Sequence, residues 1–130
     1  ASGDMYATGS YLPSDERLKE KFQDFNNALE KLNQLDIKTY YFKKELCQKL
    51  NLSDKLQFGF TAQNLEKIFP SMINTSDHLT IDENGNFTNE TINIKAVNYD
   101  QLIPVLIKGM QEQQTLIEEL KEEIEKLKNK

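Results

Sequence analysis

The segment Leu12-Pro13-Ser14-Asp15-Glu16-Arg17-Leu18-Lys19 stands where an irregular start gives way to a strongly periodic stretch of sequence. Pro13 disfavours a helix on its upstream side, and Ser14 is a good N-cap because its hydroxyl can accept a backbone N–H of the first turn. Asp15 and Glu16 then favour the positive end of the helix dipole. We therefore predict a helix that begins at Ser14.

Ser14 and Lys19 also carry the side chains of a nucleophile and a general base. Positions five apart on a straight helix point about 140° away from each other, so the two can meet only if Ser14 lies outside the first turn and folds back. A lysine acts as a base when it is neutral, so its pKa must fall from about 10.4 through burial or neighbouring cations such as Arg17 and Lys21. The residues leave two interpretations open, a helix cap with a solvated lysine and a reactive pair.

Length and charge limit the class of protein. The chain has 130 residues, is 38% hydrophobic and carries a formal net charge of −5. It is long enough for one domain with a modest core, or for a small domain with an extended appendage. The acidic balance argues against nucleic acid and an anionic membrane as partners, and no apolar run approaches the roughly 18 to 20 residues that span a bilayer. A start at Ala1 without Met suggests a piece of a longer protein.

Few metal-ligating or redox residues are present. The one cysteine, Cys47, excludes an intrachain disulfide, and one histidine, His78, leaves no Cys/His cluster for zinc. We expect Cys47 to be buried and His78 to lie at the surface, in the lead-in to a strand. No phosphate loop or histidine-based triad is present either, so we predict neither a metal nor a cofactor.

The first half of the chain is predicted to hold one long helix. Residues 1–13 have no period and are interpreted as a connector or the end of an upstream stem. From Ser14 to about Asn33, apolar residues recur at steps of four and three, which predicts one helical stripe. The stripe consists of Leu18, Phe22, Phe25, Leu29 and Leu32.

The middle of the chain alternates between strand and helix signals. β-branched and aromatic runs predict strands, Thr61 is a plausible N-cap, Pro70 stops a helix, and Asn84-Gly85 predicts a hairpin with a primed turn. The predicted elements are strands within 35–42 and 56–60, helices within 43–51 and 61–69, and a hairpin from 78 to 97. We assign residues 14–97 to one globular region.

The last helix is predicted over residues 98–130. Asn98 to Gln101 resembles a capping box, and beyond Pro104 the apolar positions recur every three and four residues. They define a heptad seam made of Leu106, Met110, Gln113, Ile117, Leu120, Ile124 and Leu127.

A narrow seam on a long helix predicts self-association. Glu123 at position g faces Lys128 at the following e, an arrangement that favours a parallel partner in register. Isoleucine at a with leucine at d leans towards two strands, whereas Gln113 and Met110 leave the number of strands open. The competing interpretation is that the helix folds back onto its own domain.

Three segments together resemble a known family. Ser14-Asp15-Glu16-Arg17-Leu18-Lys19, then Gly59 to Pro70 (GFTAQNLEKIFP), then Val97 to Leu106 (VNYDQLIPVL) look like the C-terminal intramolecular chaperone domain of phage tailspikes and tail fibres, of which endosialidase tailspikes are the type case. The three segments occur in the family's order and precede a coiled coil.

The resemblance implies a function. It implies a homotrimer at the end of a longer chain that holds three copies together while an upstream β-rich stem intertwines. The domain then cuts itself off beside Ser14, with Ser14 as nucleophile and Lys19 as general base. If Ser14 attacks the preceding carbonyl, the bond that breaks is the one between Pro13 and Ser14. The implied setting is phage virion assembly in the bacterial cytoplasm, or the bacterial cell surface.

The same residues also fit a function without self-cleavage. The alternative is a structural trimerisation and attachment module in which Ser14 and Lys19 are ordinary surface residues. The run of glutamates within 118–125 disfavours a membrane-surface helix. The predicted fold is α+β, with a small antiparallel sheet packed by the first helix and the long C-terminal helix in a parallel three-stranded coiled coil.

Overall fold

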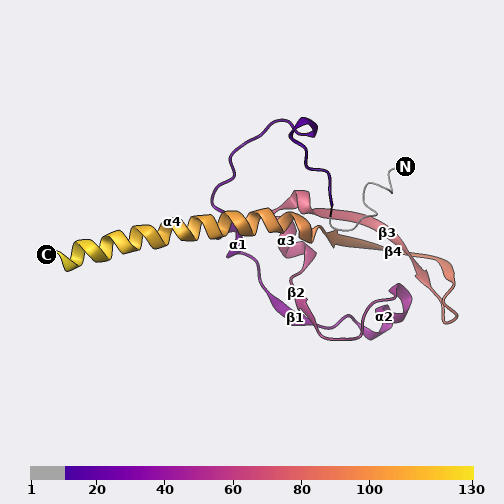
Figure 1. Ribbon diagram of the computed structural model, residues 1–130. Coiled ribbons are helices and arrows are strands. Elements are labelled where there is room, and N and C mark those ends of the chain that lie inside the picture. Colours follow the sequence, from indigo (N-terminus) through magenta and orange to yellow (C-terminus); the bar gives the residue numbers. More distant parts are fainter. Residues whose placement is uncertain (1–10) are drawn as a thin grey trace.

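The computed structural model describes residues 11–130, so most of the predicted connector at 1–13 lies outside the described residues. Short helices and two separate two-stranded sheets form a body, and one long helix projects from it (Figure 1). The predicted α+β class is confirmed. In chain order the elements are η2 (Glu16–Leu18), α1 (Ala28–Leu32), β1 (Lys38–Tyr40), α2 (Lys44–Leu50), β2 (Gln57–Gly59), α3 (Ala62–Ile68), η3 (Pro70–Met72), β3 (Ile73–Ile81), β4 (Phe87–Val97), η4 (Tyr99–Gln101) and α4 (Leu102–Lys128).

The prediction of one long helix over residues 14–33 is wrong. A single 3-10 turn, η2, is followed by residues 19–27 without regular structure, and α1 is only five residues long. Lys21 and Asn27 have left-handed backbones, with φ of 58° and 64°, which a right-handed helix cannot contain. The apolar stripe was misleading because Leu18 and Phe22 are 68% and 71% exposed. Only the end of the predicted helix exists.

Elements with a local cap or stop signal were predicted correctly. The Thr61 side chain accepts the N–H of Asn64 at 3.0 Å and begins α3, and Asn51 ends α2 with a left-handed backbone. β1 and β2 pair antiparallel within the two predicted strand segments. These signals depend on neighbours in sequence, so they hold whatever the tertiary structure.

The hairpin β3–β4 is present, but its turn is not the predicted primed turn. The Gly85 N–H donates to the Asp82 carbonyl at 3.0 Å, and Gly85 has φ of 80° while Asn84 does not have a positive φ. A type I′ turn needs a positive φ at both central residues. The Asp82 side chain accepts the N–H groups of Asn84 and Asn86 at 2.9 and 3.0 Å, and this carboxylate stabilises the wider turn instead.

The core lies mainly between helices, and Ile73 of β3 and Val97 of β4 pack at its edge. α1 packs mainly against α4, so the prediction that the first helix packs the sheet is wrong. A five-residue helix presents too little apolar surface for a sheet face, and its fully buried Ala28 fits close to other helices. The buried apolar residues are Ala28, Leu65, Ile68, Phe69, Met72, Leu102 and Val105.

α4 begins later than its sequence signals indicate. The Asn98 side chain makes no capping hydrogen bond, and η4 precedes α4, so the capping box predicted at 98–101 is wrong. Pro104 is the third residue of α4. The N–H groups of the first turn have no partner within a helix, so the missing donor of proline costs little there.

α4 presents two separate faces. Leu102, Val105 and Gly109 are buried against the body. The predicted seam lies about 100° further round the helix, as 3.6 residues per turn require, and its residues are exposed. Its six apolar members, between 45% and 69% exposed, are Leu106, Met110, Ile117, Leu120, Ile124 and Leu127; its seventh member is Gln113. The second half of α4 extends beyond the body (Figure 1). The seam is thus exposed both beside the body and beyond it.

Gly109 is the point of closest approach between α1 and α4. A Cβ at this position would lie 3.0 Å from Leu32 Cδ1 and 3.5 Å from Leu29 Cδ2. We predict that Gly109→Val lowers the free energy of unfolding by about 1–3 kcal/mol, because two further methyl groups overpack this contact. Chemical unfolding measures the change. The matched variant Thr115→Val, at an exposed position of α4, should stay within about 0.5 kcal/mol of wild type. Equal stability of Gly109→Val and wild type would contradict the tight contact.

Candidate active site

The segment around Ser14 folds into one tight turn. Asp15, not the predicted Ser14, is the N-cap of η2, and its Oδ1 accepts the backbone N–H of Arg17 at 2.9 Å. The N–H groups of Leu18 and Lys19 donate to the carbonyls of Asp15 and Glu16. Lys19 then leaves the turn in extended conformation, with φ of −117° and ψ of 149°. Ser14 and Lys19 thus flank the turn from outside it.

This turn brings the two predicted catalytic side chains together. Lys19 Nζ donates a hydrogen bond to Ser14 Oγ over 2.6 Å. The helical geometry that would separate them by about 140° does not apply, because both lie outside the single 3-10 turn. The distance is within the range in which a base can take a proton from a hydroxyl. We call Ser14 and Lys19 the dyad.

An ion pair inside the turn stabilises its shape. Nε of Arg17 lies 3.1 Å from Asp15 Oδ1, and Nη2 lies 2.8 Å from Oδ2, so the guanidinium forms a hydrogen bond with each carboxylate oxygen. The Arg17 guanidinium holds the pKa of the Asp15 carboxyl below its usual range, and the carboxylate in turn raises the pKa of Arg17. Arg17 is therefore engaged with Asp15, a partner that sequence analysis did not predict.

The dyad is open to solvent in the single chain. Pro13, Ser14 and Lys19 are all exposed, and a shallow hollow beside the dyad is lined by Ser14, Glu16, Lys19 and Phe22. Phe22 contributes an apolar wall to this hollow although its ring is 71% exposed. The hollow offers a nucleophile, an amine and one apolar side chain, with room for a further surface to cover them.

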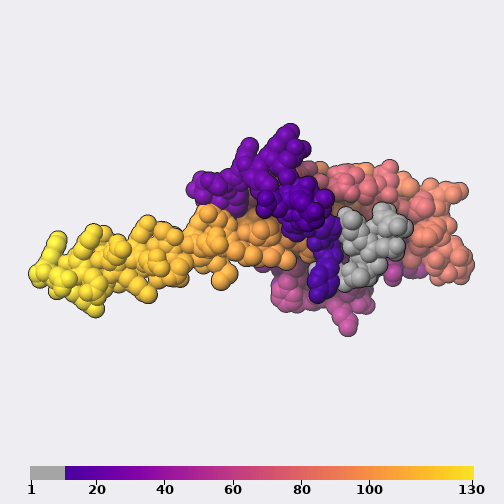
Figure 2. All heavy atoms as spheres, turned by 45° about the horizontal axis from the view of Figure 1, so that its top comes forward, coloured from indigo at the N-terminus to yellow at the C-terminus, as the bar shows by residue number. Residues whose placement is uncertain are grey.

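We call residues 11–27 the dyad arm. It loops out from the body and returns across the first half of α4, while the far end of α4 stays uncovered (Figure 2). Near its end, the ring of Phe25 lies 6.3 Å from that of Phe69, and the arm then enters α1 through the left-handed Asn27. The arm is thus fixed to the body at its carboxyl end.

Glu112 of α4 holds this attachment point, and sequence analysis missed it. Its Oε2 accepts the N–H of Ala28 at 3.1 Å and its Oε1 that of Leu29 at 2.9 Å. The carboxylate therefore caps α1 in place of Asn27, whose side chain makes no capping bond. No local signal could have identified Glu112, because it lies more than 80 residues away and at a heptad position that normally faces water.

The cap predicts a dependence on pH. The N–H of Leu29, with that of Ala28 and the charge of Lys108, holds the pKa of Glu112 below its ordinary value of 4.5. A lowered pKa means that the stabilisation is complete above the ordinary value and is lost as pH falls through the lowered one. We predict that wild type is more stable than Glu112→Gln at pH 7 and that this difference disappears in acid. Unfolding midpoints measured from pH 7 to pH 3 check this; a constant difference would contradict it.

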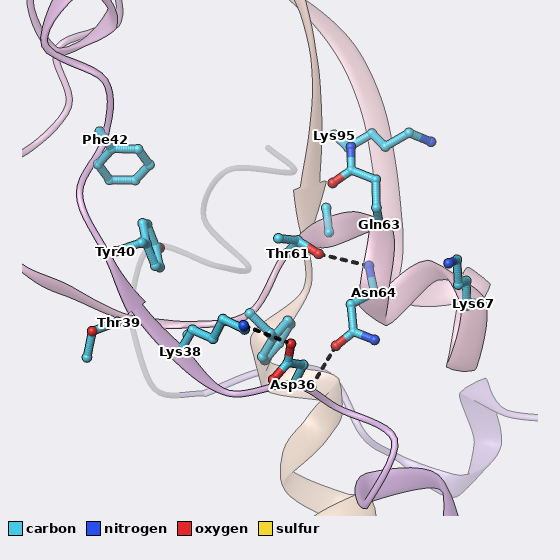
Figure 3. A pocket seen from close by; sticks show the side chains of 13 residues that line it. Asp36, Lys38, Thr39, Tyr40, Phe42, Thr61, Gln63, Asn64, Lys67 and Lys95 are labelled. Atoms are coloured by element: carbon cyan, nitrogen blue, oxygen red, sulfur yellow. Dashed lines mark hydrogen bonds and ion pairs between the residues drawn. The ribbon is translucent and has the colours of Figure 1, made fainter.

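A second hollow lies between β1 and α3 (Figure 3). Several of its polar side chains are engaged with their neighbours. Asn64 Oδ1 accepts the N–H of Asp36 at 2.8 Å, and Lys38 pairs with Asp36 at 3.4 Å. Lys95, on its rim, pairs with Glu66 at 2.9 Å. These contacts join β1 and β4 to α3, and none of the residues that line this hollow belongs to the dyad.

The remaining candidate residues have structural surroundings. His78 is exposed within β3 and shares a hydrogen bond of 3.0 Å with Ser76. Cys47 is partly exposed, which corrects the prediction of a buried thiol; α2 is a surface helix without buried residues. Among residues 11–130, no group of three His, Cys, Asp or Glu side chains is placed to hold a metal ion. In the same part of the chain, no helix has the length and apolar character needed to cross a membrane.

The fold and the site define a class of protein: a small α+β domain that combines a serine–lysine pair on a turn with a long helix bearing a free heptad seam. Residues 14–74 match the model of the family Peptidase_S74, described as the chaperone of endosialidase. This match agrees with the resemblance that the motifs indicated. The match begins at Ser14 and includes Lys19 and the Gly59 to Pro70 segment; the third motif and α4 lie beyond it.

Proposed function

We propose that this chain is a self-cleaving intramolecular chaperone, which trimerises through α4, guides the folding of an upstream β-rich stem and then releases itself. The observation that carries the proposal is the 2.6 Å hydrogen bond between Lys19 Nζ and Ser14 Oγ. The family match of residues 14–74 supports the chaperone role. The free seam of α4 supports the association.

The cleavage is a single-turnover reaction at the bond between Pro13 and Ser14. Neutral Lys19 takes the proton of Ser14 Oγ as the oxygen attacks the carbonyl carbon of Pro13, and the lysine then gives a proton to the departing Ser14 nitrogen. The C–N bond breaks as an ester forms. Water hydrolyses the ester, leaving a carboxylate on Pro13 and a new amino terminus at Ser14. Release is effectively irreversible, and it therefore locks the folded stem kinetically.

Association supplies what the single chain lacks. A lysine amine can accept a proton only when neutral, and burial favours the neutral form. Lys19 is exposed in the single chain, so a neighbouring surface must cover the dyad hollow before it reacts. Assembly of three chains around the seam, with the stem strands beside the dyad arms, would provide that surface. Cleavage would then follow assembly instead of preceding it.

A coiled coil at the end of the chain also suits the chaperone role. Pairing of distant strands from three chains is slow to begin, because loop-closure and association entropy are lost before contacts form. Joining the three copies through α4 raises the effective concentration of the stem segments and sets their register.

The decisive experiment is the intact mass of subunits after expression of the natural parent protein, wild type beside Ser14→Ala. We expect a wild-type fragment that begins at Ser14 and its absence from the variant. Ser10→Ala, a hydroxyl removed just upstream in the same parent, should cleave like wild type. Full-length chains from both proteins would instead favour the structural trimerisation module, with Ser14 as a surface residue.

A further inference from the structure

We propose that Glu112 is a positioning residue for the dyad: from the helix that carries the seam, it anchors the dyad arm and so couples self-cleavage to formation of the coiled coil. This inference rests on the proposed function for its reaction and on the geometry of α1 and α4 for its mechanism.

The anchor is a cap supplied across the tertiary structure. An isolated helix as short as α1 is unstable in water, and its first N–H groups need acceptors. Both carboxylate oxygens of Glu112 are used, one on Ala28 and one on Leu29. Ala28 is fully buried with Glu112 in place, so removal of the carboxylate takes away the acceptor that satisfies its N–H. An unsatisfied buried donor is costly, and release of the start of α1 is the alternative.

The packing around Glu112 reinforces the anchor. Gly109, less than one helical turn earlier, lets Leu29 and Leu32 approach the backbone of α4. On the other side, a hollow between the arm and α4 is lined by residues that include Phe25, Lys108 and Gln111. The arm has no regular structure between η2 and α1. Within residues 11–130, contacts at its carboxyl end help to hold the arm on the molecule, and the Glu112 cap supplies two hydrogen bonds there.

The location of Glu112 links this anchor to association. Glu112 lies between Met110 and Gln113, two members of the seam, and its hydrogen bonds to Ala28 and Leu29 place it on the side of α4 that faces α1. When chains associate through the seam, the turn of α4 that contains Glu112 takes a fixed position relative to the same turn in the other chains. The three arms, and with them the three dyads, then take defined places around the coiled coil. Without the cap, the local turn of the dyad persists, but the arm can swing away from the surface that should cover it.

The test compares Glu112→Ala, Glu112→Gln and Glu119→Ala in the full parent protein. Glu119 is the matched control, since it lies two turns further on the same side of α4 and is exposed, without a hydrogen bond in the described part of the chain. Three quantities are measured: formation of the Ser14 fragment, mass of the assembly, and hydrogen exchange of the Ala28 and Leu29 amides. For Glu112→Ala we expect an intact trimer, lost protection of both amides and cleavage slowed at least tenfold. Glu112→Gln, whose single carbonyl oxygen can accept one of the two N–H groups, should be intermediate, and Glu119→Ala should match wild type.

Two results would overturn the inference while leaving the proposed function standing. One is cleavage at the wild-type rate in Glu112→Ala despite lost protection of Ala28 and Leu29. The other is loss of the trimer in Glu112→Ala but not in Glu119→Ala, since assembly would then explain slow cleavage. Absence of the Ser14 fragment from wild type would overturn the proposed function and, with it, the role of Glu112 toward the dyad. Hydrogen exchange identifies which has failed, because it reports the anchor without any cleavage.

Discussion

Lys19→Arg in the parent protein is expected to give intact trimers that yield no fragment beginning at Ser14. Arginine keeps the positive charge and can still donate a hydrogen bond to Ser14 Oγ, so a purely structural role of Lys19 would survive the change. It cannot serve as a base, because its guanidinium stays protonated in proteins. General base catalysis contributes about 10²- to 10⁴-fold to a rate, and we expect a loss in that range. Intact mass measured over time after synthesis gives the rate.

Lys21→Arg is the matched control for this variant. Lys21 is a second exposed lysine of the dyad arm, two residues away, and has no hydrogen bond to Ser14. Its replacement should leave cleavage unchanged. If Lys19→Arg cleaved like wild type, Lys19 would only position Ser14 through a hydrogen bond, and another group would be the base. Lys19→Ala should also be inactive, and comparison of the two variants separates loss of the base from loss of the contact.

Ile117→Lys is expected to convert the assembly into monomers. Ile117 occupies an a position in the middle of the seam and is 45% exposed in the single chain. In a parallel coiled coil the a side chains of all copies meet at the axis, so three ammonium groups would be buried together without partners. Burying an unpaired charge costs several kcal/mol, and we therefore expect association to weaken by more than 10²-fold. Sedimentation equilibrium of the 130-residue chain measures the change directly.

Thr115→Lys is the matched control, because it distinguishes an effect on the seam from an effect of positive charge elsewhere on α4. Thr115 lies two residues before Ile117, at a heptad position that a coiled coil leaves in water. The variant therefore adds the same positive charge to the same helical turn, outside the seam. It should associate like wild type. Equal masses for Ile117→Lys and wild type would show that the seam is not the contact. A wild-type dimer would keep the seam as the interface but contradict the trimer that the family resemblance implies.

Helix α4 presents two different faces. Leu102, Val105 and Gly109 pack on the body, whereas the seam points to solvent. A helix that used its seam to cover its own domain would have no surface left for other copies. The separation of the two faces explains how one element can belong both to the folded body and to an assembly, and it answers the alternative that the predicted seam folds back on the domain.

Local signals in the sequence determined much of this protein. Thr61 and Pro70 delimit α3 because a cap and a missing N–H act on adjacent residues. The hairpin follows from two strand patterns around Asn84-Gly85, and the length of α4 follows from its heptads. The resemblance to the family was already evident from the segments that begin at Ser14 and Gly59. The sequence also indicated that Ser14 and Lys19 can meet only if Ser14 lies outside a helix, and the hydrogen bond between them agrees with this condition.

Only the tertiary structure decided how the dyad region folds. An apolar stripe from Leu18 to Leu32 favours a helix, but left-handed backbones at Lys21 and Asn27 interrupt it. The start of α1 depends on the carboxylate of Glu112, whose distance in sequence hides it from any local pattern. The periodicity of α4 likewise revealed a seam but not which face packs on the body. Caps and periods act within a few residues and can be read from sequence; contacts between distant residues form only once the chain has folded.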